Sequence, residues 1–155
     1  IENDVLKMVV IERHKASGNI GKGFVKGFGL KSGAIASTVA HDSHNMIVIG
    51  TNDDDMYIAI RELVKSQGGK VVVNNGKVIS KLELPIAGIM SEEKAEDVIK
   101  KFDNLSKAEK IVGCTLAEPF MTMAFLSLSV IPELKLTDKG LMDVMQGKFI
   151  NLFIE

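Results

Sequence analysis

The stretch that decides the fold is Met46-Ile47-Val48-Ile49-Gly50-Thr51-Asn52-Asp53-Asp54-Asp55. It opens with a continuous apolar run, which is typical of a buried central strand. Thr51 or Asn52 can then cap a helix, and three aspartates fill the first turn, where the helix dipole favours negative charge. The apolar residues that follow recur on one helical face: Met56, Ile60, Leu63 and Val64. The stretch therefore predicts a central strand followed directly by an amphipathic helix, with Gly68-Gly69 as its C-terminal stop.

Apolar runs on both sides of this unit predict a sheet. Before it lie three candidate strands: Leu6 to Glu12, Ile20 to Leu30 and Ala34 to Val39. After it, two apolar runs flank Asn74-Asn75-Gly76, which is a hairpin signal because Asn and Gly tolerate positive φ. The glycines between Gly21 and Gly29 form neither a Walker loop nor a G-x-G-x-x-G that opens a helix. We interpret them as points where another backbone approaches closely, or as bulges within strands.

The second half of the chain carries further helical signals. Ser91 is expected to cap a helix whose buried stripe contains Ala95, Val98, Ile99 and Phe102. The capping box Ser106-x-x-Glu109 predicts that this helix breaks near Asn104 and restarts. An apolar, methionine-rich stretch runs from Phe120 to Val130, and Phe149 to Ile154 is expected to form a last strand. Residues 1–155 are thus predicted to form one α+β (or α/β) layered domain, with a mixed, mostly antiparallel sheet and two or three helices.

The composition is that of a globular domain and excludes several classes of protein. The 155 residues are 46% hydrophobic and 25% charged, and a formal net charge of -1 gives no electrostatic footprint for nucleic acid or an anionic membrane. No apolar run reaches the roughly 18 residues that suggest a membrane span. The single cysteine, Cys114, fits a small, semi-buried side chain and a reducing compartment, so we expect a cytoplasmic protein. Ile1 stands where an initiator methionine is usual, which suggests a piece of a longer protein.

Two of the three histidines fall in the run Ala40-His41-Asp42-Ser43-His44-Asn45. Titratable and hydrogen-bonding groups at this density, between two apolar segments, are costly unless they are solvated or used. Three interpretations stay open: a metal site completed by carboxylates, a turn that bonds its own backbone, and a polar loop that faces a ligand or a neighbouring domain. Two other clusters receive plainer interpretations, Glu12-Arg13-His14 as a solvated strand end and Asp53 to Asp55 as acids that need no ion.

A family resemblance is carried by blocks of sequence that cover nearly the whole chain. The blocks are Phe24 to Leu30, Gly33 to Ser37, Ala40 to Asn45, Leu84 to Ser91, Pro119 to Thr122, Val130 to Asp138 and Gly140-Leu141. In this order they resemble the C-terminal domain of the bacterial and archaeal adenine deaminases. The resemblance implies an enzyme of the amidohydrolase superfamily that hydrolyses adenine to hypoxanthine and ammonia in purine salvage.

The resemblance also implies cofactors and partners. In that family a divalent metal, manganese or iron, is held mainly by an N-terminal (β/α) barrel, which needs about 250 residues. This chain has no room for the barrel and lacks its H-x-H pattern, so no metal is expected within the chain. The expected partners are the barrel of the same protein, adenine and further copies in a homo-oligomer, with no nucleic acid and no membrane. The isolated chain is expected to be inactive.

Two main hypotheses follow for the histidine run. In the first, it faces the active site of the intact enzyme, where His41 or His44 contacts the purine or relays a proton, and Asp42, Ser43 and Asn45 bind substrate or face it. In the second, the domain is structural, and Phe120 to Val130 packs against the barrel or a sister subunit without any contact to the active site. A third reading is a free-standing module that binds a purine or a metal.

Overall fold

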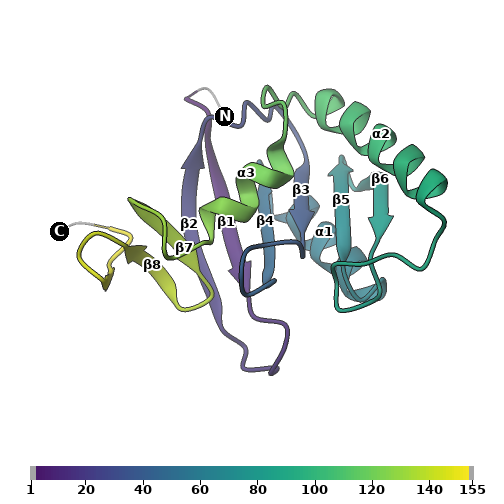
Figure 1. The fold of residues 1–155 in the computed structure, drawn as a ribbon. Helices are drawn as coiled ribbons and strands as arrows, with labels where there is room; N and C mark the ends of the chain where they lie inside the picture. Colours follow the sequence, from purple (N-terminus) through teal and green to yellow (C-terminus); the bar gives the residue numbers. More distant parts are fainter. Residues whose placement is uncertain (1–2, 154–155) are drawn as a thin grey trace.

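The computed structural model describes residues 3–153, which form two antiparallel sheets and three α-helices (Figure 1). The larger sheet has the strand order β2-β1-β4-β3-β5-β6 and the smaller one β7-β8-β9. The strands are β1 (Val5–Ile11), β2 (Ile20–Lys26), β3 (Ala34–Ser37), β4 (Met46–Gly50), β5 (Gly69–Asn74), β6 (Lys77–Glu83), β7 (Leu134–Thr137), β8 (Gly140–Asp143) and β9 (Lys148–Ile150). The helices are α1 (Asp53–Lys65), α2 (Ala95–Ile111) and α3 (Pro119–Leu126). The predicted layered α+β class is confirmed, and each pairing between these strands is antiparallel.

One face of the large sheet is covered by α1, as the deciding stretch predicts. The Asn52 side chain caps the helix by accepting a hydrogen bond from the Asp55 amide at 2.8 Å. The buried Asp55 carboxylate accepts bonds from the amides of Asn75 (3.2 Å) and Gly76 (2.7 Å). The helix start and the predicted β5–β6 turn are therefore joined by one carboxylate. Below them, Ala36, Met46, Val48, Ala59, Leu63, Val71 and Val73 form an apolar core.

The opposite face carries a larger core beneath α2, α3 and the small sheet. Its buried side chains come from every layer and include Leu6, Met8, Val10, Ile47, Ile49, Leu105, Met123 and Leu136. The glycines of β2 let the small sheet approach. A Cβ built at Gly21 would lie 1.7 Å from the Thr137 carbonyl oxygen, and one at Gly23 would lie 3.3 Å from the Leu136 side chain. The predicted close approach at these glycines is confirmed.

Several expectations for the second half of the chain are wrong. The second helix starts at Ala95 with Lys94 as its N-cap, whereas Ser91 accepts a bond from the Glu93 amide outside the helix. It then continues through Asn104 without a break, because Leu105 and Ala108 keep one face against the core. Of the residues expected in its buried stripe, Val98 does pack against the core. Ala95, Ile99 (60%) and Phe102 (42%) are exposed instead.

The C-terminal sheet differs from the expected single strand. The strand expected over Phe149 to Ile154 is shorter and spans Lys148–Ile150, and Ile154 lies outside the described residues. The β7–β8 hairpin has no counterpart in the sequence analysis. In it, Leu136 points into the core while Leu134 remains exposed.

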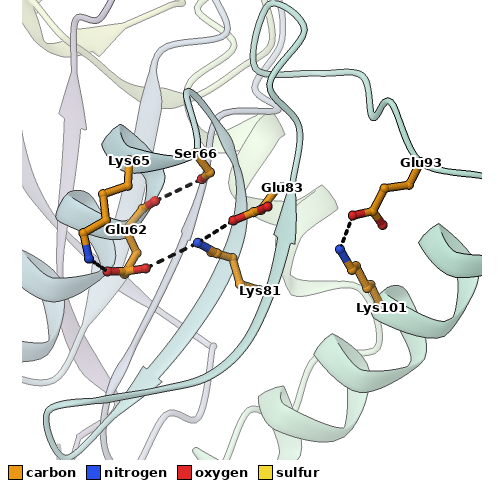
Figure 2. A network of polar contacts seen from close by, with 7 residues as sticks. All are labelled: Glu62, Lys65, Ser66, Lys81, Glu83, Glu93 and Lys101. Atoms are coloured by element: carbon orange, nitrogen blue, oxygen red, sulfur yellow. Dashed lines mark hydrogen bonds and ion pairs between the residues drawn. The ribbon is translucent and has the colours of Figure 1, made fainter.

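A polar network connects the first helix to the last strand of the large sheet (Figure 2). Lys81 lies between the carboxylates of Glu62 and Glu83, at 3.3 Å and 2.7 Å, and Glu62 also pairs with Lys65. These ammonium groups lower the pKa of Glu62. Nearby, Lys101 of α2 pairs with Glu93. Among the described residues, no helix combines the length and hydrophobicity that crossing a membrane requires.

Candidate functional site

The histidine loop, residues 40–45, belongs to the connection between β3 and β4, at one end of the large sheet (Figure 1). The turn is closed locally. The amide of His44 donates to the carbonyl of Ala40 at 2.7 Å, and the amide of Asn45 donates to the Ser43 hydroxyl at 3.4 Å. This part of the structure agrees with the interpretation of a strand-to-strand turn that bonds its own backbone.

The outer side of the loop borders a hollow of about 310 Å³. The hollow brings together segments that are far apart in the sequence: the loop, the end of α3 and the β7–β8 turn. Its polar lining comprises His41, Asp42, Ser43, Ser127, Ser129, Thr137, Asp138 and Lys139, and its apolar lining comprises Val10, Leu128, Val130, Met142 and Phe149. Its volume is at the small end of the range for small-molecule sites, whose linings likewise combine apolar and polar side chains. Three of the five predicted site residues thus share one cavity.

His41 is the histidine that faces outward. Its ring is half-buried and lies 5.3 Å from the Phe125 ring and 6.4 Å from the His44 ring, measured between centroids. Phe125 belongs to the outer face of α3, so the polar loop and this apolar helix meet at His41. The Asp42 and Ser43 side chains next to it are exposed.

His44 is turned toward the protein and has a defined proton arrangement. The amide of Ala40 donates to its Nδ1 at 3.2 Å, so Nδ1 is an acceptor and the neutral ring carries its proton on Nε2. Burial first, and then the neighbouring His41 and Arg13, lower the pKa of His44, while Asp42 opposes them. The lowered pKa favours the neutral imidazole, the form in which Nδ1 can accept from the Ala40 amide.

Asn45 is buried and is not part of the lining of the hollow. Its side chain is 4% exposed and donates from Nδ2 to Asp138 Oδ1 at 3.1 Å. Its Oδ1 has no hydrogen-bond partner among the described residues. Asp138 also receives a long bond of 3.5 Å from Asn19. Asp138 was not predicted as a site residue, because the Asn45 side chain that it binds lies 93 positions away in the sequence.

Arg13 and His14 are further residues of this site that sequence reasoning placed at a solvated strand end. The guanidinium donates from Nε to the His44 carbonyl at 2.6 Å and from Nη2 to the Ala87 carbonyl. His14 Nε2 donates to the Ser43 carbonyl at 2.7 Å, since a carbonyl oxygen can only accept. The adjacent guanidinium and imidazole of Arg13 and His14 are visible in the sequence. The neighbouring residues do not reveal the carbonyls that these side chains bind, because those carbonyls lie far along the chain.

The loop does not provide a metal site. Within residues 3–153, no three His, Cys, Asp or Glu side chains are grouped closely enough to hold a metal ion. His44 Nδ1 is occupied by a backbone amide, and Asp138 is occupied by Asn45. The donor set therefore does not fit the divalent cation that the family resemblance implies.

Comparison with known sequences identifies the domain. A family model described as the adenine deaminase C-terminal domain matches residues 1–148. The chain belongs to this family. It is 52% identical over 152 residues to an adenine deaminase of Clostridium botulinum (strain 657 / Type Ba4), covering 98% of this chain and 25% of the relative. It is 53% identical to one from Dehalococcoides mccartyi and 51% identical to one from Moorella thermoacetica, each aligned over 26% of its length.

The predicted resemblance to the adenine deaminase C-terminal domain is confirmed by these matches. The chain spans about a quarter of the length of the curated relatives. The histidine loop, the α3 segment and the β7–β8 turn all lie inside the region that the family model covers. The hollow they line is therefore built from segments of the adenine deaminase C-terminal domain itself.

Proposed function

We propose that this chain is the C-terminal part of an enzyme that hydrolyses adenine to hypoxanthine and ammonia in purine salvage. The observation that carries the proposal is the match to the adenine deaminase C-terminal domain over residues 1–148, supported by relatives named adenine deaminase at about half identity. In the proposal, catalysis requires the sequence that these relatives have beyond the matched quarter, an amidohydrolase barrel by resemblance. The isolated chain is then inactive.

A divalent cation, manganese or iron, is part of this proposal for the intact enzyme. When bound, it would supply the hydroxide that attacks the purine carbon bearing the amino group. The residues of this chain do not fit as its ligands, because the described donors are not grouped. We therefore assign the cation to the barrel. The intact enzyme is proposed to be cytoplasmic, which agrees with a free, buried Cys114.

One surface of the domain is suited to face the barrel. We define it, the α3 surface, by Met121 and Phe125 of α3 together with His41 of the loop. Met121 is 52% and Phe125 43% exposed, and the His41 ring contacts Phe125. Exposed apolar side chains on a helix that packs on the core from its other side are typical of an interface. Because the His41 ring lies against Phe125, a barrel that packs on α3 would also lie next to the histidine loop. Both the catalytic and the structural hypothesis therefore place the barrel on the α3 surface.

Within the loop, the geometry favours His41 over His44 for a direct role. His44 Nδ1 is engaged by the Ala40 amide, whereas His41 lines the hollow beside Asp42 and Ser43. We propose that His41 contacts the purine or moves a proton, with Asp42 and Ser43 beside the substrate. His44 and Asn45 hold the loop in shape.

The experiment is made in the full-length enzyme. His41→Ala is expected to lower kcat/KM for adenine by 10²–10⁴-fold, the usual contribution of a positioned acid–base group, followed by the loss of adenine absorbance. Lys15→Ala, on an exposed loop, serves as the control. A His41→Ala enzyme within about twofold of the parent would eliminate the direct role.

The structural alternative makes a different prediction. If the α3 surface only packs on the barrel, Met121→Asp disturbs packing and lowers the melting temperature of the intact protein, while His41→Ala alters stability alone. Calorimetric titration of the 155-residue chain with adenine, with and without Mn²⁺, tests the free-standing module. Our proposal expects no heat in either titration, and a saturable signal would contradict it.

A homo-oligomer is the last part of the proposal. Helix α2 leaves Ile99 and Ile111 about 60% exposed, and both lie on a helix distinct from the α3 surface. We propose that these side chains contact a sister subunit. Light scattering of the full-length enzyme gives its mass, and a monomer at micromolar concentration would overturn this part.

A further inference from the structure

The guanidinium of Arg13 is half-buried and donates its hydrogen bonds to main-chain carbonyls. Within residues 3–153, the ion pairs do not include Arg13, so its charge is not neutralised by a contacting carboxylate. Burial lowers its pKa, yet an arginine remains protonated at any physiological pH. A half-buried charge without an ion pair is costly unless hydrogen bonds compensate it. The two carbonyls that compensate this charge therefore indicate which parts of the chain Arg13 holds together.

The two acceptors belong to two different connections. Nε donates to the carbonyl of His44 in the histidine loop at 2.6 Å, and Nη2 donates to the carbonyl of Ala87 in the segment between β6 and α2. The planar fork of a guanidinium suits two acceptors held at fixed positions. Arg13 itself follows the end of β1. One side chain thus joins three parts of the chain.

The Ala87–Gly88 segment is shaped to receive this guanidinium. Gly88 has φ +75°, which favours glycine, and a Cβ built there would lie 2.2 Å from Arg13 Nη2. The segment is itself fixed, because the buried Thr38 hydroxyl donates to the Gly88 carbonyl at 2.6 Å and accepts from the Gly69 amide at 2.8 Å. Arg13 therefore ties the histidine loop to a segment that Thr38 in turn hydrogen-bonds to the start of β5.

The same guanidinium acts on the charge of His44. The titratable and charged groups that face His44 are His41 and Asp42 of its own loop, and Arg13 and His14 beyond the end of β1. Arg13 is the permanent cation among them, and it contacts the His44 carbonyl. Its fixed positive charge adds to burial and to His41 in disfavouring protonation of the imidazole.

We propose that Arg13 is a positioning residue that holds the histidine loop through the His44 carbonyl and places a fixed positive charge beside His44. The loop is then left with His41 as its histidine free to exchange a proton in the hollow. This last step rests on the proposed function, while the hold on the loop and on His44 does not.

The first test uses the 155-residue chain labelled with ¹³C-histidine and ¹⁵N. Arg13→Gln is compared with Arg61→Gln, which removes the same charge from the chain's other arginine, on the exposed side of α1. In Arg13→Gln the titration midpoint of His44 is expected to rise. Exchange of the His44 amide, which is bonded to Ala40, is expected to quicken by about tenfold or more, as for the loss of one charged hydrogen bond. Arg61→Gln is expected to change neither.

Equal His44 midpoints and equal amide exchange in the two variants would overturn the proposal. This comparison requires that Arg13→Gln is folded. Arg13→Lys is therefore made as a second, milder variant. It keeps the charge and loses the two-acceptor fork. Its expected result is faster amide exchange with a His44 midpoint near that of the parent, and parental values for both would contradict the positioning role.

The second test is kinetic and separates this inference from the proposed function. In the full-length enzyme, Arg13→Gln is expected to lower kcat more than it changes KM, with partial recovery in millimolar guanidinium, and Arg13→Lys to recover part of the loss. If His41→Ala is impaired while Arg13→Gln matches the parent, the positioning role fails and the function stands. If the His44 spectra respond to Arg13→Gln but neither Arg13→Gln nor His41→Ala affects turnover, Arg13 holds the loop as described. The proposed catalytic role of the histidine loop then fails.

Discussion

The buried carboxyl of Glu109 provides the sharpest prediction about stability. Glu109 lies on the inner side of α2 with 7% of its surface exposed. Burial, and next the negative charge of Glu118, raise the pKa of Glu109 to about 7, although Lys70 and Lys110 pull it in the other direction. Lys70 approaches from β5, where its ammonium lies 4.6 Å from the centroid of the Phe102 ring. The carboxyl is thus protonated in the folded chain at pH values where an ordinary glutamate is ionised.

The sign of the effect on stability follows from proton binding. Between pH 4.5 and about 7 the folded state keeps a proton that the unfolded state has released, so the free energy of unfolding falls as the pH rises through this range. At ~1.4 kcal/mol for each pH unit between the two pKa values, the loss approaches about 3 kcal/mol above pH 7. This direction is the reverse of that for a carboxylate held in an ion pair.

Glu109→Gln removes this dependence, because the amide resembles the protonated carboxyl and cannot ionise. The variant is expected to match the parent within about 0.5 kcal/mol at pH 4.5 and to be more stable by up to about 3 kcal/mol at pH 8. The assay is urea unfolding of the 155-residue chain at half-unit pH steps. Glu96→Gln, exposed on the same helix, is the control and is expected to show no such divergence. A Glu109→Gln advantage that is equal at pH 4.5 and pH 8 would refute the reasoning.

Three further changes test how the loops are held. Asp55→Ala removes the carboxylate that binds two turn amides and is expected to cost about 1–3 kcal/mol in urea unfolding, whereas its exposed neighbour in Asp54→Ala stays within about 0.5 kcal/mol. Thr38→Val removes a buried hydroxyl that bonds two loops and is expected to cost a similar 1–3 kcal/mol, roughly; an unchanged midpoint would contradict the assigned bonds. Gly21→Ala places a Cβ against the Thr137 carbonyl oxygen and is expected to lower the melting temperature by at least about 4 °C and to shift the amide resonances of the β7–β8 hairpin.

Features that depend on neighbouring residues could be predicted from the sequence. Asn52, one of the two caps expected, and the turn at Asn74 to Gly76 were predicted because each needs only a few adjacent side chains and a particular φ. The unbroken second helix shows the limit of such signals. Ser106-x-x-Glu109 has the pattern of a capping box, but Leu105 is buried in the core, and tertiary packing outweighs a local cap.

The site could be predicted in part. The histidine loop was found because its residues are contiguous, and His41, Asp42 and Ser43 do line one hollow. Arg13 was noticed but interpreted as part of a solvated strand end, and Asp138 was not predicted, since they meet the loop across 31 and 93 positions of sequence. Only the pairing of β1 with β4, and the packing of the small sheet on β2, bring those side chains within reach.

The 93 positions between Asn45 and Asp138 have a consequence for synthesis of the protein. A ribosome adds roughly 5–20 residues each second, so the loop waits for about 5–20 seconds before the aspartate that pairs with it has been made. During that interval the Asn45 side-chain amide has no Asp138 to donate to. A nascent domain interrupted before β7 therefore has its histidine loop but lacks Thr137, Asp138 and Lys139, which form the other wall of the hollow.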